Sequence, residues 1–233
     1  MVRSTAPNPG GPAFAVAGRQ PMKPPALRIK SHWFKDGAVK SPEQQASAMA
    51  FIVWRTAHQM LKRMRGADFD IDAGQPYFAF MREVLVFLIA LTDRIAYARM
   101  DPPTREAFTP ALVRHVAATL SGNELDLLGP RADGVDPADV FIDLVNQVTP
   151  HYAEFGSDPH QDEATRGFAP DFGFLRYLGH RLEPTLPPKD QRWVLDQVMA
   201  AEAPDAVQVV QGAMRDLLSG EPATRRRAGL SGD

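Results

Sequence analysis

The chain of 233 residues contains no cysteine. A disulfide framework, a thiolate metal site and a cysteine nucleophile are therefore excluded. The absence of cysteine is compatible with a reducing compartment but does not prove one. Asparagine is also scarce, and the chain has 20 Arg against 6 Lys. This bias is typical of GC-rich bacterial genomes, so we expect a bacterial protein.

The chain also lacks the short motifs that mark several common enzyme classes. It has no Gly-x-Gly-x-x-Gly, no Gly-x-x-x-x-Gly-Lys, no Gly-x-Ser-x-Gly and no His-Glu-x-x-His. The sequence therefore gives no support for dinucleotide binding, for a phosphate-binding loop, for a hydrolase with a serine in a nucleophile elbow, or for a zinc peptidase. General acid–base catalysis needs only two well-placed side chains and leaves no motif. The sequence thus favours a non-catalytic protein without excluding an enzyme.

Long apolar runs are missing as well. Between Glu83 and Asp93 only Thr92 is polar, and a helix over 84–92 rises about 14 Å, against roughly 30 Å of bilayer hydrocarbon. We therefore expect no transmembrane segment. The apolar stretch 13–17 is shorter than the core of a signal peptide. Without a targeting segment, the expected location is the cytoplasm.

Charge is distributed unevenly, although the whole chain carries only −2. Residues 1–30 carry five basic residues and no acidic one, whereas residues 31–220 sum to −8. An acidic body repels phosphate backbones, so we expect no binding of nucleic acid by the folded domain. The basic arm could contact an acidic partner or membrane surface, but tails of this size are more often simply solvated.

The pattern of apolar residues divides the chain into three parts. Residues 1–30 are rich in Pro, Gly and Ala and show no periodicity, which predicts a disordered basic arm. Residues 221–233 predict a disordered polar tail. Between them, residues 31–220 are expected to form one all-α domain, with a weak internal boundary near 156–169. No segment alternates as a strand would.

Two helices are expected to organise this domain. Residues 76–100 are apolar on nearly every side, as in a helix buried at the centre of a core. Residues 42–65 follow an N-cap at Ser41 with Gln44 three positions later, a capping-box pattern. The short connection between them predicts an antiparallel hairpin. The fold class we expect is an irregular all-α bundle of about seven helices built on this hairpin.

Further helices are expected over residues 101–128, 136–155, 170–182, 187–199 and 204–218. The first is expected to be kinked or split, because Thr109-Pro110 repeats the start signal of Asp101-Pro102.

The hairpin carries a group of polar side chains on mostly apolar faces: Arg55, His58, Glu83, Asp93 and Arg94. Placing 65 opposite 77 would bring His58 next to Glu83. Buried charges usually pair, because desolvating one alone costs several kcal/mol. One interpretation is a polar cleft with a tuned carboxylate or histidine. The other, which we favour, is a set of ion pairs that fixes the register of the helices.

Metal sites have weaker support. His151 and Glu154 share a helical face, and His160 and Asp162 follow in a polar connection, but a di-iron bundle needs two Glu-x-x-His motifs and further carboxylates. The aspartates of 68–74 resemble the start of a calcium loop, yet Ala73 and Ala79 occupy positions that need Gly and Glu. We expect neither a metal nor another cofactor.

Two functions remain open. The first is a non-catalytic helical interaction or accessory protein, whose partner is another protein. The alternative is a small-molecule- or metal-binding helical domain, including an enzyme that uses the acid–base side chains of the hairpin. The missing motifs and the charge asymmetry favour the first.

Overall fold

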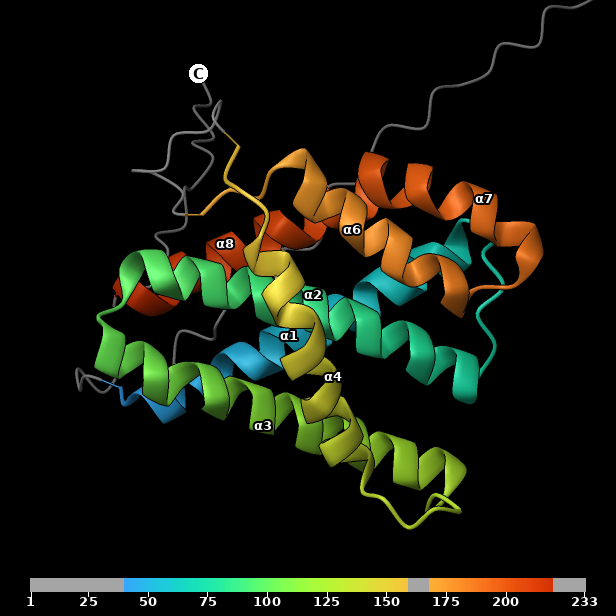
Figure 1. Ribbon diagram of the computed structural model, residues 1–233, viewed down its shortest axis with the longest axis horizontal. Helices are drawn as coiled ribbons and strands as arrows, with labels where there is room; N and C mark the ends of the chain where they lie inside the picture. The colour runs from blue at the N-terminus through green and yellow to red at the C-terminus, as the bar shows by residue number, and fades with distance from the viewer. Residues whose placement is uncertain (1–39, 159–167, 220–233) are drawn as a thin grey trace, which may run out of the picture.

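The computed structural model describes residues 40–158 and 168–219, and these residues form an all-α fold, as predicted (Figure 1). The α-helices are α1 Pro42–Gly66, α2 Gln75–Arg99, α3 Pro102–Leu128, α4 Pro137–Ala153, α6 Phe172–Leu182, α7 Pro188–Gln197 and α8 Ala203–Ser219. A 3₁₀ turn, η2 (Glu183–Thr185), and a π-helical turn, η3 (Val198–Glu202), connect the last three. The predicted arm 1–30, the tail 221–233 and most of the boundary segment lie outside the described residues.

The start of α1 confirms the predicted capping box. Ser41 Oγ accepts a hydrogen bond from the Gln44 backbone N–H (3.3 Å), and Gln44 Oε1 accepts one from the Ser41 N–H (3.0 Å). Each bond satisfies a backbone donor that the first turn of a helix leaves without a partner. The apolar positions at three- and four-residue spacing are buried, from Ala46 through Met64.

Helix α2 lies at the centre of the fold. It contacts α1, α3, α4, α6 and α8, and Figure 1 shows it running through the middle of the molecule. Every residue from Val84 to Asp93 is buried. Burying an aliphatic or aromatic side chain of this size contributes about 1.5–3 kcal/mol. The apolar run that marked 76–100 in the sequence is therefore the centre of the core.

The connection between α1 and α2 folds back along the end of α1. Phe69 N–H donates to the Met64 carbonyl, and the Arg65 guanidinium donates to the Ile71 carbonyl. Phe69 and Ile71 are buried by this turn. The two helices run in opposite directions (Figure 1). The Tyr77 hydroxyl, near the start of α2, lies 3.0 Å from His58 Nε2.

Helix α3 is continuous through Pro110. Of the two expected outcomes at Thr109-Pro110, a kink or a split, the split does not occur. The buried side chains on either side, Phe108 and Leu112, keep packing against the core. Tertiary packing of this kind offsets the local cost of a helical proline.

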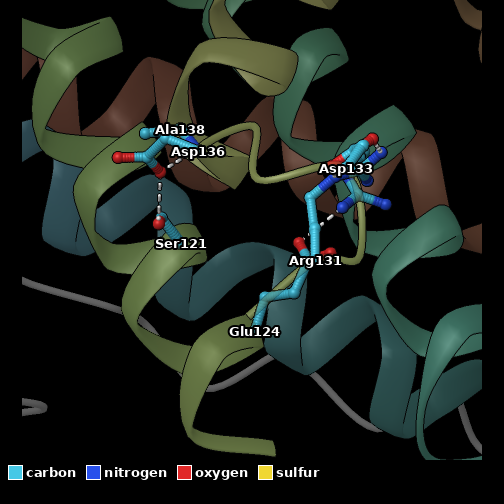
Figure 2. A network of polar contacts seen from close by, with 7 residues as sticks. Ser121, Glu124, Arg131, Asp133, Asp136 and Ala138 are labelled. Carbon is cyan, nitrogen blue, oxygen red and sulfur yellow. Dashed lines mark hydrogen bonds and ion pairs between the residues drawn. The ribbon is translucent and has the colours of Figure 1, made fainter. Parts of the chain in front are cut away.

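The α3–α4 connection is held by short-range polar bonds (Figure 2). Asp136 is the N-cap of α4, and its Oδ1 accepts from the Ala138 N–H (2.8 Å) and from Ser121 Oγ on α3 (2.9 Å). Arg131 donates two bonds to Asp133, 3.0 and 2.6 Å long, and together with the Val135 N–H lowers the pKa of Asp133 to about 2. The first turn of α4 is therefore anchored to the C-terminal half of α3.

Candidate functional site

The candidate site is a groove of about 640 Å³ between α3 and α4, with α2 behind it. The start of α4 is bonded to Ser121 of α3 through Asp136. From there α4 crosses in front of α2 and does not cover the N-terminal half of α3 (Figure 1). The groove is lined by Ile89 and Asp93 of α2, by residues 105–114 of α3, and by residues 142–153 of α4. The crossing of two anchored helices thus produces a surface hollow.

Apolar side chains from three helices face this groove: Ile89, Val113, Ile142, Val145 and Ala153. Ile89 and Val145 are buried, whereas Val113 and Ile142 are half-buried. Hydrophobic linings with few polar groups are typical of binding sites. The rim carries charges of both signs, from Arg105, Glu106 and Arg114.

Asp93 is the acidic group at the floor of the groove, and its oxygens are engaged. Arg105 donates to it from Nε (3.0 Å) and Nη2 (2.6 Å), and Thr109 Oγ1 donates at 2.7 Å. The hydrogen bonds to Asp93 also raise the pKa of Arg105. Three donors already occupy the oxygens of this carboxylate, so little of its hydrogen-bonding capacity is left for a substrate.

Two Thr-Pro pairs line the groove from opposite sides, Thr109-Pro110 on α3 and Thr149-Pro150 on α4. Proline has no N–H, so the helical donor to the carbonyl four residues earlier is missing. These carbonyls belong to Glu106 and Asn146, and both residues also line the groove. Each wall of the groove therefore has one backbone acceptor without its usual helical partner. The paired Thr-Pro signal was readable in the sequence.

The structure does not bring the five predicted hairpin residues together. Glu83 accepts two hydrogen bonds from Arg181 of α6, 2.8 Å from Nε and 2.6 Å from Nη2. Arg94 donates to the carbonyls of Ala153 and Phe155 at the end of α4, and its guanidinium lies 4.6 Å from the centroid of Phe168. With Asp93 bonded to α3, these residues tie α2 to three neighbouring helices.

Arg55 and His58 line a different hollow, of about 470 Å³, on the outer side of α1. His58 Nε2 and Tyr77 Oη are 3.0 Å apart, and the His58 ring centroid is 4.9 Å from that of Trp54. Burial, together with the charges of Arg55 and Arg65, lowers the pKa of His58. The remaining residues of this hollow are Gln59, Leu61, Lys62 and Arg65.

An aromatic cluster surrounds Tyr152, which points into the core from α4. The centroid of its ring lies 4.7 Å from that of Phe174, 4.9 Å from that of Tyr177 and 6.0 Å from that of Phe87. The Tyr152 hydroxyl is buried and has no hydrogen-bond partner among the described residues. Burial and the nearby charge of Glu83 raise its pKa well above the ordinary value. This hydroxyl is therefore neutral and unsatisfied.

Two buried carboxylates were not predicted from the sequence. Glu124 of α3 pairs with Arg82 of α2, and Glu202 of η3 pairs with Arg63 of α1 at 2.8 Å. Both glutamates have a relative exposure of 1%. Burial raises the pKa of Glu202, although Arg63 and Gln197 donate hydrogen bonds to it. Acidic residues at these positions look like solvated helix residues in the sequence, and nothing local identifies a partner so distant along the chain.

Of the weaker metal candidates, His151 and Glu154 are both exposed at the end of α4. His160 and Asp162 lie outside the described residues. Within 40–158 and 168–219, no group of three or more His, Asp or Glu side chains is placed to hold a metal ion.

Among the helices that the structure describes, none combines the length and the apolar character that crossing a membrane requires. Comparison with known protein families, with curated proteins and with solved structures gives no match to this chain.

Proposed function

We propose that this is a non-catalytic helical interaction protein whose α3–α4 groove binds the apolar face of an amphipathic helix from a partner protein. One observation carries the proposal: apolar side chains line the groove, while its acidic floor residue, Asp93, is already bonded to Arg105 and Thr109. A site for acid–base chemistry needs an available carboxylate or imidazole. A site for an apolar helix face does not.

The dimensions of the groove support a helical occupant. The α3 wall spans residues 105–114 and the α4 wall spans 142–153, which at 1.5 Å per residue corresponds to about 15 Å. That length accommodates roughly three helical turns, with apolar anchors at i, i+3 or i+4, and i+7.

The proposed location and the type of partner follow from the composition of the chain. The proposal places the protein in a bacterial cytoplasm, with a protein as its partner and no nucleic acid on the folded domain. The acidic body and the basic arm support this assignment, because charge asymmetry accelerates association with a charged partner.

The test is site-specific photo-crosslinking in the native host. A photoreactive residue at Asn146, exposed on the groove, is compared with one at Arg192, exposed on α7. The cross-linked segment is then synthesised as a peptide, and its affinity and helicity on binding are measured. We expect the photoreactive residue at position 146, and not the one at position 192, to cross-link a partner segment. The peptide with the sequence of that segment should become more helical when it binds. A peptide that does not bind, or that binds without becoming helical, would contradict the proposal.

The second candidate function, binding of a small molecule, is favoured by one observation. A volume of about 640 Å³ falls within the range of roughly 300–1,000 Å³ typical of ligand pockets. Native mass spectrometry of protein purified from its own host distinguishes the two. A small molecule retained by the wild type and lost from Ile142→Lys would replace the partner helix as the occupant.

A further inference from the structure

A stripe of one aromatic and four basic residues follows one face of α1. Phe51, Arg55, His58, Lys62 and Arg65 recur at intervals of four, three, four and three residues, so all five lie on the same side of the helix. From Arg55 to Arg65 the stripe is about 15 Å long. The last four residues also line the hollow of about 470 Å³ described above. We call this feature the basic hollow.

Like charges gather in the basic hollow, and no acidic residue is among the described residues that line it. Within the described residues, none of the ion pairs involves Arg55 or Lys62. Arg63, which points elsewhere on α1, does pair, with Glu202. On a body that carries −8 over residues 31–220, clustered cations repel one another and cost folding free energy. Such a cluster is typical of a site that meets an anion.

Two side chains of the basic hollow, Arg65 and His58, are held in place by neighbouring groups. Arg65 donates from Nε and Nη2 to the Ile71 carbonyl, which leaves its Nη1 available. His58 is fixed by its bond to Tyr77 and by the Trp54 ring. Trp54 and Leu61 supply an apolar wall. An arginine guanidinium beside an aromatic surface is better suited to bind a phosphate group than to bind an isolated carboxylate.

We propose that the basic hollow binds a phosphate-bearing small molecule, with Arg55, Lys62 and Arg65 contacting the phosphate oxygens and Trp54 contacting the remainder. This site is independent of the α3–α4 groove and of its partner. The charged and titratable groups facing His58 are Arg55, Arg65 and Tyr77. A bound anion would offset the two arginines, so the imidazole would protonate at a higher pH than in the free protein.

The test uses the full chain at low ionic strength, with inorganic pyrophosphate as the probe. Calorimetry measures binding, and NMR follows the titration of His58. We expect saturable binding, a raised pKa of His58, and an affinity about ten-fold lower in Lys62→Gln and in Arg55→Gln. The matched control is Arg192→Gln, an exposed arginine that lies 4.9 Å from the Trp193 ring on α7, and it should bind like the wild type.

Three results would overturn the proposal. The first is the absence of saturable binding, or equal affinity in all three variants. The second is equal affinity for sulfate and pyrophosphate, which would indicate an adventitious ion only. The third is binding to vesicles containing anionic phospholipid without binding to pyrophosphate, which would identify a membrane surface instead of a free phosphorylated molecule.

Discussion

Asp93 and Arg105 form a two-bonded ion pair, 3.0 and 2.6 Å long, that ties the central helix α2 to α3 at the floor of the groove. The side chain of Asp93 has a relative exposure of 12% and that of Arg105 has 35%. Thr109 adds a third bond to the same carboxylate. The pair therefore fixes the N-terminal half of α3, which forms one wall of the groove.

Asp93→Asn should lower the free energy of unfolding by about 1–3 kcal/mol, because an amide cannot accept from Arg105 and Thr109 as a carboxylate does. Denaturant unfolding measures this change. Asp133→Asn is the matched control, since its pair with Arg131 is exposed, and solvent screening should leave its midpoint nearly unchanged. Equal midpoints for Asp93→Asn and wild type would show that the pair has no structural role.

Glu83→Gln tests the bond between α2 and α6. Glu83 and Arg181 lie 98 residues apart in sequence, and their side chains have exposures of 13% and 29%. We expect a lower melting temperature, because Arg181 would remain partly buried without its carboxylate. Unchanged stability would contradict the interpretation of these residues as register-fixing pairs and would favour a working site.

Tyr152→Phe should leave the melting temperature unchanged or raise it. The variant keeps the aromatic packing with Phe87, Phe174 and Tyr177, and it removes a buried hydroxyl without a partner among the described residues. Removing an unsatisfied polar group removes its desolvation cost. A clear decrease in the melting temperature would reveal a bound water or another group that satisfies the hydroxyl.

Glu202 should make stability depend on pH. Because its pKa is raised above the ordinary value of 4.5, the folded state holds this proton more tightly than the unfolded state. Its contribution to stability is therefore largest below the unfolded pKa and is lost as the pH rises through the folded pKa. Glu202→Gln should flatten that decrease and be at least as stable as wild type at pH 7. Lower stability of the variant at pH 7 would show that the bond to Arg63 outweighs burial.

Local signals were sufficient to predict much of the fold. Ser41 and Gln44 placed the start of α1, and the run from Val84 to Asp93 identified the central helix. These signals depend on residues close in sequence, whose geometry the helix itself determines. Pro110 is the exception, because packing of α3 overrides its local preference.

The candidate site depends on contacts between distant residues, which sequence patterns do not specify. Glu83 and Asp93 were expected to be charged groups on mostly apolar faces, but the identity of their partners, Arg181 and Arg105, follows only from how α6 and α3 cross α2. The groove likewise arises from the angle at which α4 leaves α3, set in part by the bond between Ser121 and Asp136.

The most direct test of the central claim is the dissociation constant of the cross-linked partner peptide for two variants. Ile142→Lys places a charge in the groove on α4, whereas Phe172→Lys changes an equally apolar side chain, 69% exposed at the start of α6. Both should retain the wild-type circular dichroism spectrum. The account predicts that Ile142→Lys weakens peptide binding at least about ten-fold, since an apolar anchor of the interface is lost, and that Phe172→Lys leaves it unchanged. Equal affinities for both variants would contradict the groove as the binding site.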